Sequence, residues 1–302
     1  MTSPARPDRP TVADLPWGLL SEHLDTIGAM LGGAARSLMP GQRPGVTGTV
    51  ITQAVRPPSA ALLAAYRAWS GARDDGCLPP HLVCAKLTLP LVSRLTAQAP
   101  YPLLSVLNQG LRLRLNAPLP AGEPLTLAGR LRDASDDGYR ARIHSEVTVG
   151  TASAPAAVIV DAMAAVMLRP RPDDSARAPA PATPDFETVA QWQAAADEGQ
   201  TFFWLTGDFN PIHTLPAFAR HTRFRGCIMH GYGAFAQLYE GLVQSGAQIA
   251  DIEVRFVRPL PLPSPPLLIQ RARTPDAEGC HAIRLCSARD GTLFQVGRYR
   301  PA

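Results

Sequence analysis

Two short stretches of the sequence combine residue types that can carry out acid–base chemistry. The first reads Thr206-Gly-Asp-Phe-Asn-Pro-Ile-His213, and the second reads Phe224-Arg-Gly-Cys-Ile-Met-His-Gly231. Asp208 and Asn210 favour a tight turn, and the proline that follows Asn210 biases its backbone towards an extended conformation. Such a turn can bring the side chains of Asp208 and His213 towards one point.

A carboxylate beside an imidazole is suited to proton transfer near neutral pH. Histidine can take and give a proton in that range, and a neighbouring carboxylate can orient a water molecule. These groups can add water to an activated double bond or remove it. We therefore predict Asp208 and His213 as a catalytic pair, and the sequence leaves open which of them handles which proton.

A glycine at the start of an apolar helix adds a third element to the predicted site. Phe235, Leu238 and Leu242 recur on one side of the segment after His230-Gly231, which predicts a helix that packs on a core. A glycine there lets a substrate carbonyl approach free backbone N–H groups, and the helix dipole favours negative charge. We predict Gly231 as a donor to an enolate-like oxygen. His230 is predicted either to contact the substrate or to hold the loop.

The pattern T-G-D-x-N-P-I-H followed by I-M-H-G resembles the signature of the MaoC-like, (R)-specific enoyl thioester hydratases and 3-hydroxyacyl thioester dehydratases, which have the hotdog fold. The resemblance implies that Asp208 and His213 are catalytic and that Gly231 supplies an N–H group to the thioester carbonyl. It also implies that Asn210 shapes the site and that the reaction needs neither a metal ion nor a cofactor.

The resemblance extends beyond this motif. Ile252-Glu-Val-Arg-Phe-Val-Arg-Pro259 is similar to the V-R-F-x-x-P strand of the family. The first half resembles the degenerate N-terminal hotdog of two-domain members around Leu78-Pro-Pro-His81 and Tyr101-Pro-Leu-Leu-Ser-Val-Leu-Asn108. Thr206 and Cys227 depart from the residues usual in the family, and neither departure removes a catalytic group.

The elements that must position these residues fall into two halves. Arg169–Asp185 is rich in proline and alanine, which predicts a semi-extended linker. Each half shows helical segments and a run of strand-like segments, which predicts an α+β architecture. The resemblance implies that these halves are two tandem hotdog domains paired as an intrachain pseudo-dimer. The predicted division is a helical lead-in over residues 1–45, a degenerate hotdog domain over 46–168, a linker over 169–185 and a catalytic hotdog domain over 186–302.

Individual elements follow from periodicity and capping. A broken helix is predicted over Leu15–Leu38, a helix capped by Ser59 runs through Trp69, and Thr214 is predicted to cap a short helix. The strands predicted in the first half are Val46–Val55, Leu103–Leu107, Leu111–Leu115, Leu125–Leu131, Tyr139–Val149 and Ala156–Leu168. The second half is predicted to have a helix over Tyr232–Val243 and strands over Ile252–Val257, Leu267–Arg273, His281–Ser287 and Phe294–Tyr299.

A faint local repeat links the two halves. Tyr66-Arg-Ala-Trp-Ser-Gly71 aligns with Phe202-Phe-Trp-Leu-Thr-Gly207, after which the sequences diverge. The first half continues with Ala72-Arg-Asp74 and lacks the Asp and His of the motif. We therefore expect one active site in each chain.

Composition excludes several classes of function. The 302 residues include 29 basic and 25 acidic side chains, with a formal net charge of +4 and Lys86 as the only lysine. No basic run predicts nucleic-acid binding, whereas a mild positive charge suits an anionic carrier such as coenzyme A or acyl carrier protein. Five cysteines without a C-x-x-C pair predict neither disulfides nor a zinc site. The absence of an apolar signal core or bilayer-length run predicts a cytoplasmic protein without membrane contact.

The predicted function is reversible hydration of 2-enoyl thioesters and dehydration of (3R)-hydroxyacyl thioesters. Two alternatives are a hotdog acyl thioesterase and a non-catalytic module that binds acyl thioesters. An assay of the reaction product distinguishes a hydratase from a thioesterase. Exchange of α-protons with solvent distinguishes a hydratase from a non-catalytic binding module. A homodimer of double-hotdog chains is a further expectation. Four arginines could bind the phosphates of the carrier, or could simply lie solvated on the surface. They are Arg223, Arg225, Arg255 and Arg258.

Overall fold

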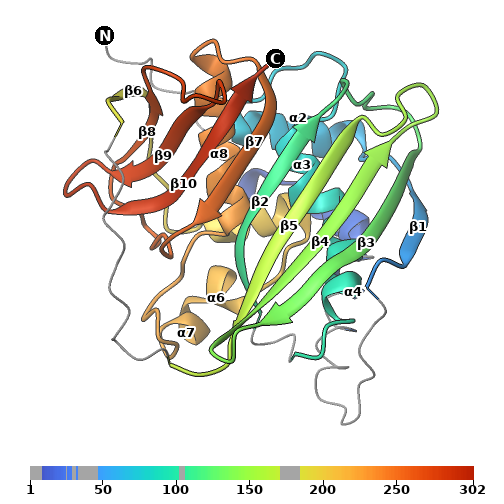
Figure 1. Cartoon of the computed structure of the whole chain (residues 1–302), viewed down its shortest axis with the longest axis horizontal. Helices are drawn as coiled ribbons and strands as arrows, with labels where there is room; N and C mark the ends of the chain where they lie inside the picture. The colour runs from blue at the N-terminus through green and yellow to red at the C-terminus, as the bar shows by residue number, and fades with distance from the viewer. Residues whose placement is uncertain (1–8, 25, 29–31, 33–46, 102–105, 171–183) are drawn as a thin grey trace.

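The computed structural model of the chain describes residues 9–24, 26–28, 32, 47–101, 106–170 and 184–302. The described strands form one antiparallel sheet in the order β1-β3-β4-β5-β2-β7-β10-β9-β8-β6 (Figure 1). They are β1 Val50–Val55, β2 Val106–Leu115, β3 Leu125–Asp136, β4 Arg140–Gly150, β5 Val158–Met167, β6 Phe186–Trp192, β7 Ile249–Phe256, β8 Leu267–Ala272, β9 His281–Ser287 and β10 Leu293–Pro301.

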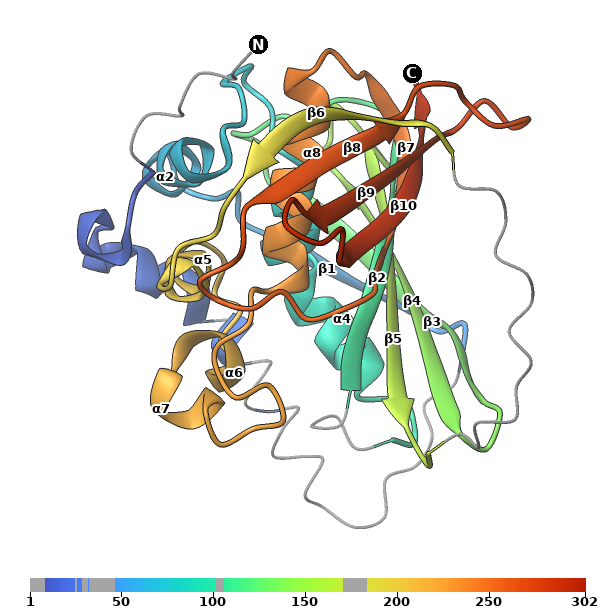
Figure 2. The ribbon, with the colours of Figure 1, turned by 90° about the vertical axis from the view of Figure 1, so that its left-hand side faces the viewer.

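The helices lie on one side of this curved sheet (Figure 2). They are the 3-10 helices η1 Val12–Asp14 and η2 Trp17–His23, the π-helix η3 Val83–Leu87, and the α-helices α2 Ala60–Ser70, α3 Pro80–Leu82, α4 Leu89–Thr96, α5 Glu198–Thr206, α6 Pro211–Thr214, α7 Pro216–Ala219 and α8 Gly231–Gln244. In α8 the apolar stripe of Phe235, Leu238 and Leu242 is fully buried. No helix in the described ranges is long and apolar enough to cross a membrane.

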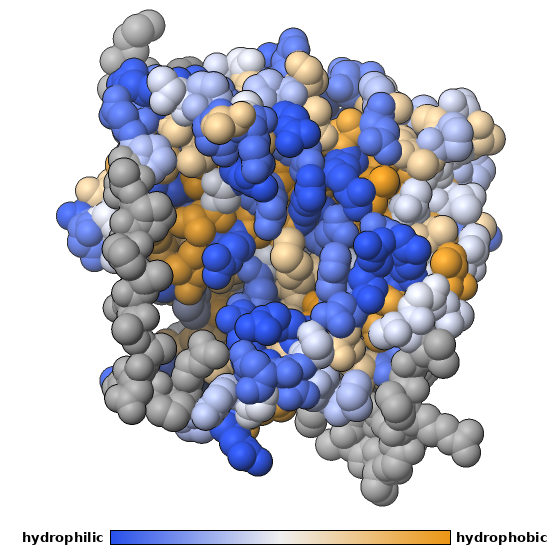
Figure 3. Space-filling model, in the orientation of Figure 1, coloured by the Kyte–Doolittle hydropathy of each residue, from blue (hydrophilic) through white to orange (hydrophobic). Residues whose placement is uncertain are grey.

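The face of the sheet that points away from the helices is polar (Figure 3). Alternate residues of β4, such as Val147 and Val149, are buried, as expected for a sheet with one buried face. On the other face, Glu146 accepts hydrogen bonds from Arg114 at 3.1 Å and from Arg130 at 2.7 Å. The apolar core therefore lies between the sheet and the helices.

The two halves of the chain meet where β2 pairs with β7. Gly110 of β2 lies opposite Arg255 of β7, and a Cβ on Gly110 would stand 2.1 Å from the carbonyl oxygen of Val254. Only glycine fits at this position, because any side chain would clash with Val254 O and because the backbone has a φ of +146°. The sheet is thus continuous across the seam between the halves.

A buried polar network ties the helices of the two halves together. His81 on α3 contacts Tyr66 Oη through Nδ1 at 2.7 Å and Glu240 on α8 through Nε2 at 2.8 Å. Trp69 Nε1 donates to Glu198 on α5 at 2.7 Å. Cutting the chain between the halves would remove the His81 partner of Glu240 and the Trp69 partner of Glu198.

We therefore expect residues 186–302, expressed alone, to be poorly soluble or to form a non-native dimer. The fragment would expose the β7 edge that pairs with β2 and the face of α8 that packs on α3. Size-exclusion chromatography and a turnover assay on the fragment and the full chain test this expectation. A monomeric, stable and fully active fragment would contradict the pseudo-dimer interpretation.

Most predicted elements are present, with shifted ends. Ser59 caps α2, since its Oγ accepts from Leu62 N at 3.1 Å, and the alanine-rich segment before the linker is strand β5 as predicted. The structure therefore confirms the α+β class. The division into residues 1–45, 46–168, 169–185 and 186–302 remains a prediction, and residues 171–183 of the linker lie outside the described ranges.

Two expectations about elements are wrong, and a third is confirmed in part. The two strands predicted at Leu103–Leu107 and Leu111–Leu115 are a single strand, β2. The chain forms a β-bulge at Asn108-Gln-Gly110, where a turn was expected. Residues 103–105 are not described. Leu215, not Thr214, precedes α7. The broken helix predicted over Leu15–Leu38 is present in part, because Trp17–His23 is a 3-10 helix and Leu24, residues 26–28 and Gly32 are α-helical. Residues 25, 29–31 and 33–38 of this segment are not described.

Candidate active site

The turn that carries Asp208 begins where α5 ends. Gly207 adopts the left-handed conformation, with φ +79°, and its N–H donates to Phe203 O at 2.7 Å. Gly71 ends α2 in the same way, with φ +83° and an N–H bond to Arg67 O at 2.7 Å. The faint sequence repeat therefore corresponds to two helices with the same C-terminal cap.

The N-terminal segment packs directly against this turn. A Cβ on Gly207 would stand 2.8 Å from His23 Cβ, and His23 Nε2 lies 2.7 Å from Trp204 O. Lys86 Nζ, which can only donate, lies 2.8 Å from His23 Nδ1, so Nε2 of His23 carries the proton that Trp204 O accepts. Burial, and then the Lys86 charge, lower the pKa of His23 to about 4, which keeps its ring neutral.

Asn210 shapes the next part of the loop. Its backbone is extended, with φ −139° and ψ 124°, as predicted from the following proline, and its Oδ1 accepts from Ile212 N at 3.2 Å. Asn210 is thus the N-cap of α6, the helix that carries His213. The side chain of Asn210 positions His213 through the backbone of the helix.

His213 presents one nitrogen to the cavity. Its Nδ1 lies 2.8 Å from Ile228 O, and since a carbonyl can only accept, Nδ1 carries the proton. Nε2 is therefore an unprotonated lone pair. Burial lowers the pKa of His213 to about 4, so the ring is neutral at physiological pH.

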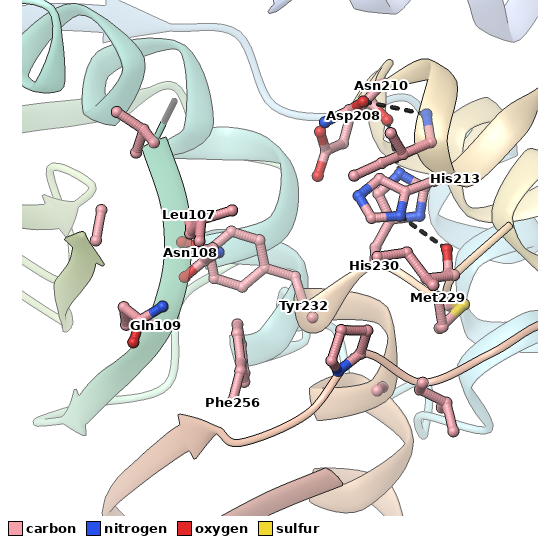
Figure 4. A pocket seen from close by; sticks show the side chains of 18 of the residues that line it. Leu107, Asn108, Gln109, Asp208, Asn210, His213, Met229, His230, Tyr232 and Phe256 are labelled. Atoms are coloured by element: carbon pink, nitrogen blue, oxygen red, sulfur yellow. Dashed lines mark hydrogen bonds between the residues drawn. The ribbon is translucent and has the colours of Figure 1, made fainter. Parts of the chain in front are cut away.

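Asp208 lies beside His213 on the same side of the cavity (Figure 4). Its carboxyl oxygens have no hydrogen-bond partner among the described residues, and the part of the side chain that is exposed faces the cavity. Burial alone raises the pKa of Asp208 from 3.8 to about 7. A carboxyl group in this range can exchange a proton in both directions at physiological pH.

His230 supports the Asp208 turn from below. Its Nε2 lies 2.9 Å from the backbone oxygen of Asp208, so this nitrogen donates, and burial lowers the pKa of His230 well below its usual value. The rings of His230 and His213 are in contact, with centroids 3.9 Å apart and an interplanar angle of 33°. The hydrogen bond to Asp208 O fits a role of His230 in holding the loop, and His230 also lines the cavity, so its role stays a prediction.

Gly231 is the first residue of α8 and leaves room for a neighbouring ring. Its carbonyl accepts from Gln295 Nε2 at 2.8 Å, whereas its N–H, at the first helical position, has no partner within the helix. Gly231 is not among the residues with positive φ, so an unusual backbone angle does not explain it. A Cβ at this position would stand 2.3 Å from the ring of Phe256.

A single cavity of about 1170 Å³ unites these groups. Asp208, His213 and Gly231 line it from the second half of the chain. Strands β2 and β5 and helix α4 line it from the first half, mostly with apolar side chains. Of the four arginines considered from the sequence, Arg223 and Arg258 line the cavity and Arg225 and Arg255 do not.

The residues that sequence reasoning missed come from distant parts of the chain. Asn108 of β2 and Tyr232 of α8 line the cavity together, and His23 and Lys86 brace the Asp208 turn. A usable signal existed for Lys86, because it is the one lysine of the chain and lies within an apolar segment. Asn108 and Tyr232 carried no comparable signal.

This site combines a carboxyl group and an imidazole ring, the N-terminus of α8 and a cavity of about 1170 Å³, an arrangement that can perform general acid–base chemistry. Residues 177–264 match the family model of the MaoC like domain, and the match includes both motif stretches. The chain therefore contains a MaoC-like dehydratase domain, as predicted. The match supports its assignment to the hydro-lyase enzymes.

One curated relative is the peroxisomal hydratase-dehydrogenase-epimerase of Neurospora crassa. The two are 27% identical over 152 residues, which is 46% of this chain and 17% of that protein. The chain thus matches less than a fifth of the length of this relative.

Solved structures with the same fold include HtdX of Mycobacterium tuberculosis, with a TM-score of 0.67 and 19% identity over 84% of this chain and 100% of that one. The full-length peroxisomal multifunctional enzyme type 2 of Drosophila melanogaster matches with a TM-score of 0.62 and 18% identity, over 84% of this chain and 48% of that one. A MaoC-like dehydratase of Phytophthora capsici matches with a TM-score of 0.61 and 16% identity, over 85% and 96%. These likenesses confirm the predicted hotdog fold.

Proposed function

We propose that this chain hydrates 2-enoyl thioesters to (3R)-hydroxyacyl thioesters, and catalyses the reverse dehydration. The observation that carries the proposal is the juxtaposition of the Asp208 carboxyl group and the His213 ring in one cavity. Gly231, the first residue of α8, lines the same cavity. The MaoC-like domain and the hydratase named in the Neurospora relative support the same reaction. Coenzyme A or acyl carrier protein is the carrier, and the acyl tail extends towards the first half.

The hydration step uses two proton acceptors to orient one water molecule. The Asp208 carboxylate and the Nε2 lone pair of His213 each accept one O–H of the water, which leaves an oxygen lone pair free to attack Cβ. As the C–O bond forms, the π electrons move towards the thioester oxygen, and the Gly231 N–H stabilises that charge. Asp208 takes the proton of the water and delivers it to Cα, so the enzyme returns to its starting state.

Asp208 is the proton carrier in this proposal because its pKa of about 7 matches the working pH, whereas the His213 pKa of about 4 makes it a weak base. His230 and Asn210 then act by positioning Asp208 and His213, through the backbone bonds described above. The basic side chains Arg223 and Arg258 lie where the carrier would meet the protein. A cytoplasmic location and a homodimer remain predictions.

The pH dependence of hydration follows from the raised pKa of Asp208. Hydration needs the ionised carboxylate, so kcat/KM should rise about tenfold per pH unit below pH 7 and reach a plateau above it. His213 stays neutral throughout this range, since its pKa lies near 4. Initial rates from pH 5 to 9 measure the profile, and a rate that fell with rising pH through 7 would contradict Asp208 as the base.

The function itself is tested with 2-enoyl-coenzyme A thioesters of graded length. Hydration removes the absorbance of the conjugated double bond and yields a 3-hydroxyacyl thioester without releasing free thiol. Release of thiol at the same rate would identify a thioesterase. Binding without turnover or α-proton exchange would identify a non-catalytic acyl-thioester module.

A further inference from the structure

The hydroxyl group of Tyr232 lies in the cavity beyond the acid–base pair. Tyr232 follows Gly231 in α8, is only 5% exposed, and its ring extends towards Asn108 of β2 (Figure 4). Burial raises the pKa of Tyr232 well above its usual value, whereas a hydrogen bond with the Asn108 side chain lowers it in part. The phenol is therefore neutral and can donate a hydrogen bond, and among the described residues no acceptor for this proton is present apart from the Asn108 amide beside it.

A β-bulge turns Asn108 towards Tyr232. The register of β2 against β5 shifts between Asn108 and Gly110, and Asn108 Oδ1 accepts from Gly110 N at 3.2 Å. This bond engages the oxygen of the amide and leaves its NH₂ group on the side of Tyr232. The bulge lies at the seam where Gly110 pairs with Arg255, so the joining of the two halves sets the direction of the Asn108 side chain.

The surroundings of this polar pair are apolar. Leu107, Phe256 and Met163 line the same cavity. The Tyr232 hydroxyl and the Asn108 side chain interact with each other. A hydrocarbon tail that displaced water from this space would leave the Tyr232 hydroxyl without a second partner, which is unfavourable for a buried polar group. A tail with an oxygen atom at this point would avoid that cost.

We propose that the acyl chain of the substrate carries an oxygen function, a keto or hydroxyl group a few carbons beyond Cβ, which accepts a hydrogen bond from Tyr232 beside Asn108. The proposal rests on the proposed hydratase function and narrows its substrate class from plain to oxygenated acyl thioesters. Tyr232 and Asn108 are specificity residues here, because they contact the tail and not the reacting carbons.

The test compares 2-enoyl-coenzyme A thioesters of one chain length, either unsubstituted or with one keto or hydroxyl oxygen at carbon 5, 6 or 7. Wild type should prefer at least one oxygenated substrate by about tenfold or more in kcat/KM, since each 1.4 kcal/mol is a factor of ten. Tyr232→Phe removes only the hydroxyl and should abolish most of that preference while retaining turnover of the unsubstituted substrate. Tyr239→Phe, on the same helix but outside the cavity lining, is the matched control and should keep the preference.

Three results would overturn the proposal: a preference for the unsubstituted chain at every position, an unchanged ratio in Tyr232→Phe, or an equal slowing of both substrate classes in that variant. Calorimetric binding of the matching saturated thioesters, which cannot react, provides a second measurement. If no enoyl thioester is hydrated, the proposed function fails. The subsite is still supported in that case if the oxygenated saturated thioester binds more tightly to wild type than to Tyr232→Phe. Equal binding would reject it.

Discussion

Asp208→Asn and His213→Ala are each expected to lower the kcat/KM of hydration by ~10²–10⁴-fold, the usual contribution of a general acid or base. Asn at 208 can still contact water but cannot carry its proton. Ala at 213 removes the Nε2 lone pair that, in our proposal, holds the second O–H of the water. Steady-state rates on one enoyl thioester measure both losses, and His221→Ala, which removes an exposed histidine of the same segment, should be near normal.

Stability provides an independent readout for Asp208. Its pKa is 3.8 when unperturbed and about 7 in the folded protein, so between these values the unfolded chain loses a proton that the folded chain keeps. The stability of wild type therefore falls, through this group, as pH rises from about 4 to about 7, and stays at the lower value above. Asp208→Asn lacks this penalty and should melt at a higher temperature than wild type at pH 8. An inactive variant that also melted lower at pH 8 would indicate a damaged fold.

The site motif could be predicted because its geometry is local. Asp208, Asn210 and His213 lie within one turn and one short helix, where proline, asparagine and glycine restrict the backbone. Alternation of apolar residues likewise predicted β3, β4 and β7 to β10, because these strands have one buried face, but it did not predict β6, Phe186–Trp192. The same local reasoning failed at Asn108-Gln-Gly110, where residues typical of a turn form a bulge inside a long strand.

The cavity could not be predicted from either half alone. Tyr232 meets Asn108 only because β2 pairs with β7, and that register depends on the close backbone contact at Gly110. In the same way, the contact of His23 with Gly207 joins the first segment of the chain to the active-site turn. Contacts between residues far apart in sequence leave no periodic pattern, so no reading of local composition can detect them.

Gly231 is the position where a small substitution should cost the most outside the acid–base pair. In Gly231→Ala and Gly231→Val the new Cβ would stand 2.3 Å from the Phe256 ring, so this ring, which also lines the cavity, must shift. Loss of one oxyanion donor costs ~10²–10³-fold in turnover, and we expect at least that loss for Gly231→Val.

The chain offers a matched control on the same helix. A Cβ on Gly241 would stand 2.6 Å from the Ile269 side chain, a comparable steric pressure, but Gly241 does not line the cavity. Gly241→Ala should therefore lower the melting temperature with little loss of kcat, because its clash is confined to the core. Gly231→Ala should lower kcat far more than Gly241→Ala does for the same decrease in melting temperature. If activity and stability fell together in both variants, Gly231 would be a packing residue only. Unchanged turnover in Gly231→Ala and Gly231→Val would leave Asp208 and His213 without an identified partner for the thioester oxygen.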